Sequence, residues 1–242
     1  MLTRRLAGLA LVSLGLAACA SPEPVKTKTL ETTGRRVLTR DDQAAITPAE
    51  ALQRLMDGNH RFVTGHSIRR DLPREAQASA EGQYPFAAIV SCVDSRVSPE
   101  LLFDQGLGDI FSARVAGNIV NDDILGSLEF ATRVSGAKLI LVVGHSACGA
   151  VKGAIGNVEL GHLTGLLGKI DPAVQAVKRR RGAGADEKNS EFVDEVAREN
   201  VRQIVRVLRD QSPILRELVE SGALKVVGGF QDLSSGRVLI LE

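Results

Sequence analysis

The sequence predicts an α/β fold with a central, mostly parallel sheet flanked by helices, and three observations support this. Two near-continuous apolar runs, residues 86–90 (FAAIV) and 139–143 (LILVV), have the composition of strands buried on both faces of a parallel sheet. Segments with a helical apolar period alternate with the strand-like runs, as is typical of α/β folds. Polar motifs with Cys or His directly follow both buried runs, where open α/β sheets place their sites.

The composition indicates a globular domain and gives no sign of nucleic-acid binding. Hydrophobic residues make up 44% of the chain, which is ample for a core. The net charge is +1 with both signs interspersed, so nothing indicates nucleic-acid binding. The longest basic run, residues 179–181, precedes a Gly-rich polar loop and is typical of a solvated helix end.

Residues 1–18 are predicted to be a lipoprotein signal peptide and not part of the fold. Two arginines precede a short apolar stretch, residues 6–16, that is too brief for a conventional membrane span. Residues 16–19 (LAAC) have the form of a bacterial lipobox, with cleavage before Cys19 and lipidation of its thiol. Ala20 favours the outer membrane, by resemblance to Gram-negative lipoproteins. We therefore expect a periplasmic protein that meets the membrane only through its lipid anchor; an ordinary cleaved secretory signal is the alternative.

A flexible tether is expected to follow the lipidated Cys, so that residues 19–46 form one segment. It carries prolines, threonines and interspersed charges without a sustained apolar period. The folded domain is expected over residues 47–242. Thr47 as N-cap, Pro48 at the first helical position and Glu50 at the third predict that a helix begins there.

The remaining helices and strands are predicted from the period of apolar residues and from the capping, Gly and Pro residues that end each element. In the first half of the domain we expect strands at residues 86–90, 109–115 and 139–143. A short helix from Ser98 and a helix capped by 121–123 and ending near Gly136 lie between them. After the third strand we expect helices at about 147–157 and 163–181, a mobile loop at 182–190, a long amphipathic helix over 192–208, a shorter helix from Pro213 to Gly222, and a closing hairpin at 224–230 and 237–241.

Cys92, His145 and Cys148 are candidate metal ligands. A lone Cys is usually a small buried hydrophobe, and a lone His is more often a satisfied polar group. Here, however, Cys92 ends one buried run, and His145 and Cys148 lie three residues apart in a Gly-bounded turn after the other. A zinc ion with three protein ligands keeps its fourth position for water, as in catalytic sites. The pattern therefore predicts a zinc enzyme with one Zn²⁺ per chain.

Asp94 and Arg96 are candidate catalytic residues beside this metal. Arg96 can hold the Asp94 carboxylate ionised and oriented through a charge-assisted contact. The structural alternative is that both residues cap the next turn and pair on the surface. Their position directly after a metal Cys favours the functional interpretation.

These motifs resemble the β-class carbonic anhydrases. The resemblance covers roughly residues 48–241 and rests on CVDSR at 92–96 and HSACG at 145–149, with further similar segments at 59–62 (NHRF), 114–118 (RVAGN), 212–213 (SP) and 228–232 (GGFQD). It implies a sheet of order 2-1-3-4 with an antiparallel fifth strand at the edge. It also implies zinc-dependent, reversible hydration of carbon dioxide to bicarbonate and a proton by zinc-bound hydroxide, in a homodimer or tetramer.

The resemblance also assigns substrate-binding residues. Gln83, nine residues before Cys92, would orient the substrate, and Phe111 and Phe130 would line a narrow apolar pocket. The backbone amide of Gly149 would face bound bicarbonate.

A second branch of the family binds inhibitory bicarbonate with an Arg and a Trp. The matching positions are Arg114 and Ile89, and the chain contains no Trp, so we do not expect that pocket here.

Two other functions share this ligand set. One is a related zinc hydrolase such as a carbon disulfide hydrolase. The other is a non-catalytic zinc-binding envelope lipoprotein, although a purely structural zinc site has no use for Asp94 and Arg96.

Overall fold

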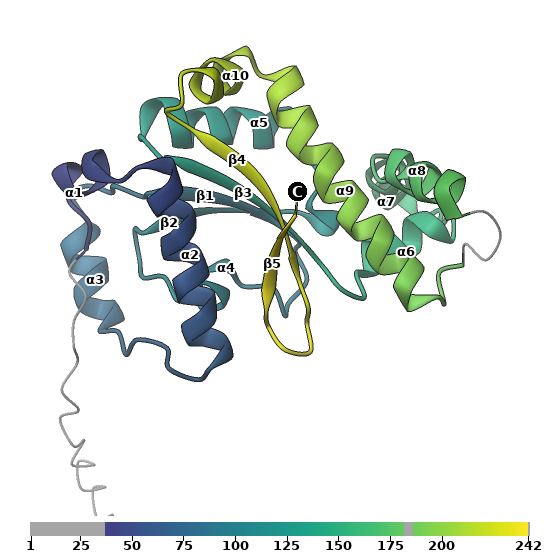
Figure 1. Ribbon diagram of the computed structural model, residues 1–242, viewed down its shortest axis with the longest axis horizontal. Coiled ribbons are helices and arrows are strands. Elements are labelled where there is room, and N and C mark those ends of the chain that lie inside the picture. Colours follow the sequence, from purple (N-terminus) through teal and green to yellow (C-terminus); the bar gives the residue numbers. More distant parts are fainter. Residues whose placement is uncertain (1–36, 182–185, 242) are drawn as a thin grey trace, which may run out of the picture. The chain divides into compact units, whose positions relative to one another are not determined.

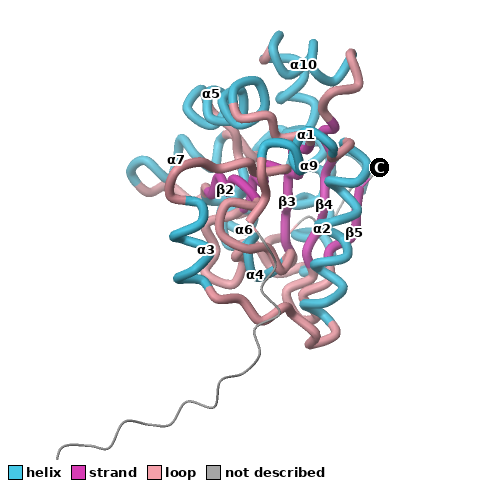
Figure 2. Tube along the Cα trace, turned by 90° about the vertical axis from the view of Figure 1, so that its left-hand side faces the viewer, coloured by secondary structure: helices cyan, strands magenta, loops and turns pink. Residues whose placement is uncertain are grey.

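A five-stranded sheet forms the centre of the computed structural model, which describes residues 37–181 and 186–241 (Figure 1). The strand order is β2-β1-β3-β4-β5, and Figure 2 shows β3, β4 and β5 side by side. Strands β1 to β4 are parallel, and β5 pairs with β4 in the antiparallel direction, which confirms the expected order. The strands are β1 (Ala87–Ser91), β2 (Ile110–Arg114), β3 (Leu139–His145), β4 (Lys225–Gln231) and β5 (Val238–Leu241).

Helices cover both faces of this sheet. Alternate strand residues point to opposite faces: Ala87 and Ile89 pack with residues of α2 and α4, whereas Ala88 and Val90 pack with α5, α9 and α10. The described helices are α1 (Arg40–Ala45), α2 (Pro48–Val63), α3 (Leu72–Ser79), α4 (Pro99–Leu102), α5 (Asp122–Glu129), α6 (Gly149–Ile155), α7 (Gly161–Gly168), α8 (Asp171–Arg181), α9 (Ser190–Gln211) and α10 (Pro213–Glu220), with short helical turns η1 (Ala116–Asn118) and η2 (Phe130–Val134).

The predicted start of α2 is confirmed, but the predicted end of the tether is wrong. Thr47 and Glu50 form a reciprocal capping box at α2. Residues 40–46 were expected within the tether, but residues 40–45 form α1 and Ile46, which follows the helix, packs in the core. The buried Gln43 side chain donates hydrogen bonds to the Pro85 and Ser135 carbonyls. Hydrogen bonds to distant residues thus order a segment that lacks an apolar period.

The single helix expected over 163–181 is also wrong, because α7 and α8 are separate helices. Lys169 and Ile170 lie between them, and Ile170 is fully buried. Pro172 lies in the first turn of α8. Because proline has no backbone N–H, it is tolerated in the first turn of a helix but would break a helix that continued through it.

Three smaller differences concern helices. Helix α3 was not predicted. The helix capped by Asn121 passes from α5 into η2, a π-helical turn that contains Phe130. Helix α6 begins only at Gly149, because the preceding turn is taken up by the candidate ligands.

Several predictions fall outside the described residues. The signal peptide, Cys19, the tether as far as residue 36, and residues 182–185 of the predicted loop are among them. Within the described ranges, no helix combines the length and apolarity needed to cross a membrane.

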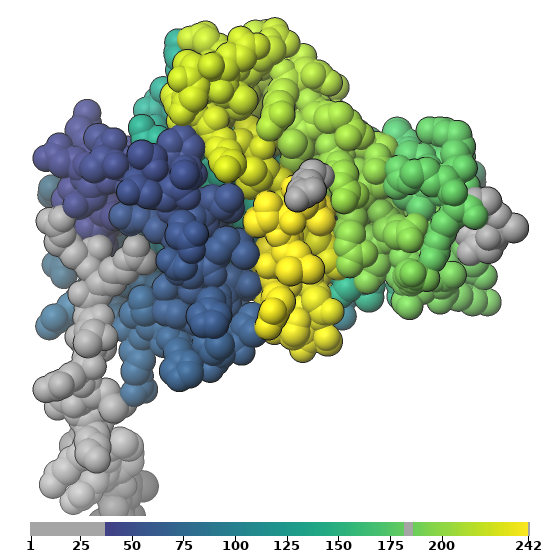
Figure 3. Space-filling model, viewed as in Figure 1, coloured from purple at the N-terminus to yellow at the C-terminus, as the bar shows by residue number. Residues whose placement is uncertain are grey.

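Asn59 joins α2 to the C-terminal hairpin, and the two segments lie side by side on the surface in Figure 3, in blue and yellow. Its buried side-chain amide donates to the carbonyls of Leu102 and Gly236, at 3.1 and 2.9 Å. Its oxygen accepts a hydrogen bond from the Val238 N–H at 2.9 Å. One side chain therefore satisfies three buried backbone groups from two distant segments.

We predict that Asn59→Ala lowers the free energy of unfolding by about 3 kcal/mol, because it leaves buried backbone groups without partners. Chemical denaturation of the zinc-loaded protein measures the change. The exposed Gln53, on the same helix, donates a hydrogen bond to the exposed Asp57 side chain, so Gln53→Ala should change stability by less than ~0.5 kcal/mol. Equal stability of the two variants would contradict this account.

Candidate metal centre

Parallel pairing of β1 with β3 brings the three predicted ligands together. Cys92 follows β1, His145 ends β3, and Cys148 is the N-cap residue of α6. Because neighbouring parallel strands end at the same edge of a sheet, the two motifs meet although some fifty residues separate them. The prediction that these residues converge is confirmed.

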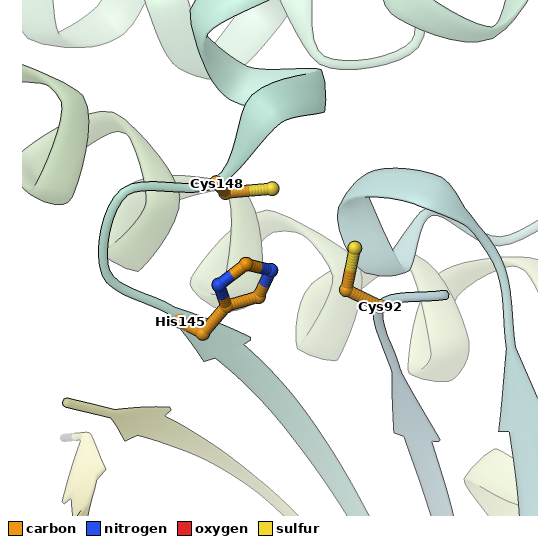
Figure 4. Close-up of side chains that lie close together, drawn as sticks. All are labelled: Cys92, His145 and Cys148. Atoms are coloured by element: carbon orange, nitrogen blue, oxygen red, sulfur yellow. The ribbon is translucent and has the colours of Figure 1, made fainter. Parts of the chain in front are cut away.

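The ligand atoms of Cys92, His145 and Cys148 all lie within 4.8 Å of one another, and all three residues are buried (Figure 4). His145 Nδ1 lies 2.9 Å from the Ser146 carbonyl oxygen, which can only accept, so Nδ1 carries the proton. The lone pair of His145 then resides on Nε2, a buried atom for which the described residues provide no hydrogen-bond partner. A Cys₂His set with a free imidazole nitrogen fits zinc, whose bonds to sulfur and nitrogen are ~2.3 and ~2.0 Å long.

The thiols of Cys92 and Cys148 are both free, and their pKa values are shifted in opposite directions. The pKa of Cys92 is lowered to about 4, first because the Cys148 thiol donates a hydrogen bond to it. The pKa of Cys148 is raised by that same shared proton and by burial. The two opposite shifts belong to the pair, because both arise from one proton shared between the sulfurs. A second thiolate in so small a space requires a cation between the sulfurs.

Two backbone N–H groups fix the Cys92 sulfur. Those of Gly117 and Asp94 donate to it at 3.3 and 3.4 Å. Gly117 has φ 68°, and a Cβ at this position would lie 2.6 Å from the Ile170 side chain. Only glycine therefore brings its N–H to the sulfur without strain. Asn200 on α9 donates to the Gly117 carbonyl at 2.9 Å and secures the turn.

A second set of contacts fixes the turn between His145 and Cys148. Ala147 adopts a left-handed conformation with φ 54°, which is costly for a residue with a side chain. The Asp194 carboxylate on α9 accepts the Ala147 N–H at 3.1 Å. The Ser146 N–H donates to the Gln231 carbonyl at 2.9 Å. The turn thus depends on α9 and β4 as well as on its own sequence.

Asp94 and Arg96 form a bidentate pair beside the ligands. Arg96 Nε and Nη2 donate to the two Asp94 carboxylate oxygens at 2.9 and 2.7 Å, and the Arg96 backbone N–H adds a third bond at 3.0 Å. The Arg96 side chain, foremost, holds the pKa of Asp94 well below its usual range. Asp94 is consequently an ionised hydrogen-bond acceptor of fixed orientation.

The structure separates the predicted substrate-binding residues into two groups. Gly149 follows Cys148 directly and begins α6, next to the ligands. Gln83, Phe111 and Phe130 lie elsewhere. Gln83 precedes β1, at the opposite end of the strand from Cys92.

Phe111 on β2 is paired with Ala88 on β1. Ala88 lies four residues before Cys92, so Phe111 is level with a point about 13 Å along the strand from the ligand. Phe111 and Phe130 meet edge to face, with ring centroids 6.3 Å apart. Both line a surface pocket of ~690 Å³. Within one chain, the structure does not bring this pocket to the metal ligands.

Gly117 and Asp194 support the centre but were not predicted to do so. The RVAGN segment gave a hint for Gly117, but nothing local marks Asp194, which lies 47 residues from Ala147 in the chain.

Comparisons with known proteins agree with this geometry. The family model described as carbonic anhydrase matches residues 87–238. Carbonic anhydrase 2 of Mycobacterium tuberculosis is 37% identical over 201 residues, covering 81% of this chain and 93% of that protein. A carbonic anhydrase of Pseudomonas aeruginosa is 35% identical over 198 residues, covering 78% and 86%.

Solved structures give the same result. One of two tetrameric β-carbonic anhydrases from Sordaria macrospora matches with a TM-score of 0.64 and 27% identity, covering 80% of this chain and 94% of that one. A β-carbonic anhydrase of Aspergillus fumigatus matches with a TM-score of 0.63 and 26% identity, covering 80% and 90%. The fold, the convergent Cys₂His set and these similarities together show that the chain belongs to the β-class carbonic anhydrases.

Proposed function

We propose that this protein is a zinc-dependent carbonic anhydrase that converts carbon dioxide and water reversibly to bicarbonate and a proton. The observation that carries the proposal is the convergence of Cys92, His145 and Cys148 beside an ionised Asp94, in a chain of the carbonic anhydrase family. A structural zinc site is closed by four protein ligands, whereas the described part of the chain offers three at this centre.

The three ligands and their surroundings suit a reactive centre. Zinc, when bound there, supplies a water molecule of lowered pKa and an electrophilic centre. Two thiolates and a neutral imidazole offset the charge of the cation, so the protein must help to orient the attacking oxygen nucleophile. Asp94 is placed for this task, because Cys92 and Asp94 belong to one loop.

Asp94 acts as a hydrogen-bond acceptor in this proposal. Arg96 keeps the carboxylate ionised, so the carboxylate can accept a hydrogen bond from the attacking oxygen and direct that oxygen's lone pair towards carbon dioxide. The side chain of Arg96 is 58% exposed and that of Asp94 16%, so the pair lies at the boundary between the buried ligands and solvent. A substrate as small as carbon dioxide can reach such a position.

The proposal includes a second copy of the chain. Gln83, Phe111 and Phe130 lie too far from the ligands to act within their own subunit. Phe130 is 50% exposed at the pocket that it shares with Phe111, so it is available to another subunit. The related enzymes of Sordaria macrospora are tetrameric. A homodimer or tetramer in which these residues face the partner's metal centre accounts for their separation here.

The cellular location is also part of the proposal. The lipobox at residues 16–19, after a short apolar stretch, supports lipidation of Cys19 and attachment to the outer membrane on the periplasmic side. The membrane contact would then be made by the lipid anchor.

We predict that Asp94→Asn keeps one zinc per chain but lowers kcat for carbon dioxide hydration about 100-fold, because the amide cannot accept hydrogen bonds as the carboxylate does. Stopped-flow hydration and zinc analysis of the same samples measure both quantities. Asp210→Asn, an exposed change on α9, is the matched control and should match the wild type. A zinc-replete Asp94→Asn protein with wild-type turnover would remove Asp94 from the mechanism.

We also predict that activity returns when two inactive subunits are combined. Cys92→Ser removes a ligand, and Gln83→Ala removes the substrate contact. A mixed assembly of these variants can be purified with two affinity tags. In it, the intact metal ligands of the Gln83→Ala subunit face the intact Gln83 of the Cys92→Ser subunit, so hydration should be regained. In the control, one subunit carries both changes and its partner is wild type, and this pairing should stay inactive. The reverse pattern would show that Gln83 serves its own subunit.

A further inference from the structure

Arg114, the last residue of β2, joins two backbone carbonyls of the loop that follows β1. Its Nε donates to the Cys92 carbonyl at 3.1 Å, and its Nη2 donates to the Asp94 carbonyl at 2.7 Å. The planar guanidinium holds these donors in a fixed geometry. The contact therefore fixes how far apart the two carbonyls lie and in which direction they point.

The loop needs such a contact because the sheet no longer supports it. Pairing of β1 with β2 ends at Ser91, whose carbonyl accepts the Val115 N–H at 3.0 Å. The next carbonyl, that of Cys92, accepts from the Arg114 side chain instead. Between the two bonded carbonyls lies Val93, which is 58% exposed and so provides little packing to hold the loop.

The Arg114 contact bears directly on Asp94. The backbone of Asp94 is held at both ends, its N–H by the Cys92 sulfur and its carbonyl by Arg114 and by the Val97 N–H. Its carboxylate is then directed by Arg96. Moving this backbone would shift the carboxylate relative to the ligands, and a displacement of about 1 Å can cost as much as 100-fold in rate.

We propose that Arg114 is a positioning residue for hydration, which acts by holding the Asp94 carboxylate in place beside the metal ligands. This inference rests on the proposed function. It gives the Arg a task that needs no neighbouring Trp, in keeping with Ile89 at the Trp position. Arg114 is exposed, so its removal opens no core cavity and the fold should persist.

A general structural role must be separated from an action through Asp94, and a double-mutant cycle does so. The proteins are wild type, Arg114→Ala, Asp94→Asn and the double variant, each zinc-loaded, with kcat and KM from stopped-flow hydration. Arg181→Ala, which removes surface ion pairs to Glu191 and Glu195, is the matched control and should match wild type. Zinc content and the visible spectrum of the cobalt-substituted proteins report on the ligands independently of activity.

Arg114→Ala should lower kcat about 10- to 100-fold. It should keep one metal per chain and the visible cobalt bands, because the ligands and the N–H bonds to the Cys92 sulfur remain. The double variant should be no more than ~2-fold worse than Asp94→Asn, because both changes act through one carboxylate. Arg114→Lys keeps the charge but lacks the two-pronged donor, and should recover only part of the activity.

Other outcomes contradict the inference. Wild-type turnover in Arg114→Ala or in Arg114→Lys would exclude the positioning role, and losses that multiply in the double variant would show an action independent of Asp94. Altered cobalt bands would show that Arg114 serves the metal ligands instead. If Arg114→Ala fails to fold, Arg114→Lys and its own cycle with Asp94→Asn decide the matter. Absence of hydration in the zinc-loaded wild type would reject the proposed function itself, a result distinct from all of these.

Discussion

The parallel pairing of β1 with β3 is the constraint on which the rest of the site depends. Their register pairs Ser91 of β1 with Val143 of β3, so both strands end at the same edge of the sheet. Cys92 and the His145–Cys148 turn therefore meet in one buried space. The apolar packing of both sheet faces holds this register, because a slip of one residue would turn every side chain to the other face. The metal centre is thus a consequence of the core.

Electrostatics then determines what the buried space can hold. The opposite pKa shifts of Cys92 and Cys148 mark a position where two negative sulfurs would repel each other. His145 Nε2 adds a buried lone pair that no group in the described part of the chain satisfies. A divalent cation satisfies all three groups at once. The pair of Asp94 and Arg96, outside this core, is charged and partly solvated, which suits contact with a small substrate.

Local signals were sufficient for much of this architecture. The buried strands, the capping box at Thr47 and the two ligand motifs follow from patterns within a few residues, and the structure confirms them. Features that depend on distant contacts were missed: α1 is ordered by the Gln43 side chain, and α7 is separated from α8 at the buried Ile170. The same reason explains why the support of the ligand turn by Asp194 could not be predicted.

The most direct test of the account is stopped-flow hydration of carbon dioxide by the purified protein, with zinc content measured before and after chelation. The account predicts fast hydration at one zinc per chain, loss on chelation and recovery on adding zinc back. Bound zinc at one per chain without hydration at neutral or alkaline pH would contradict it. Turnover of carbon disulfide by that same sample would then identify the related hydrolase, and inactivity towards both gases would leave a binding or structural zinc site.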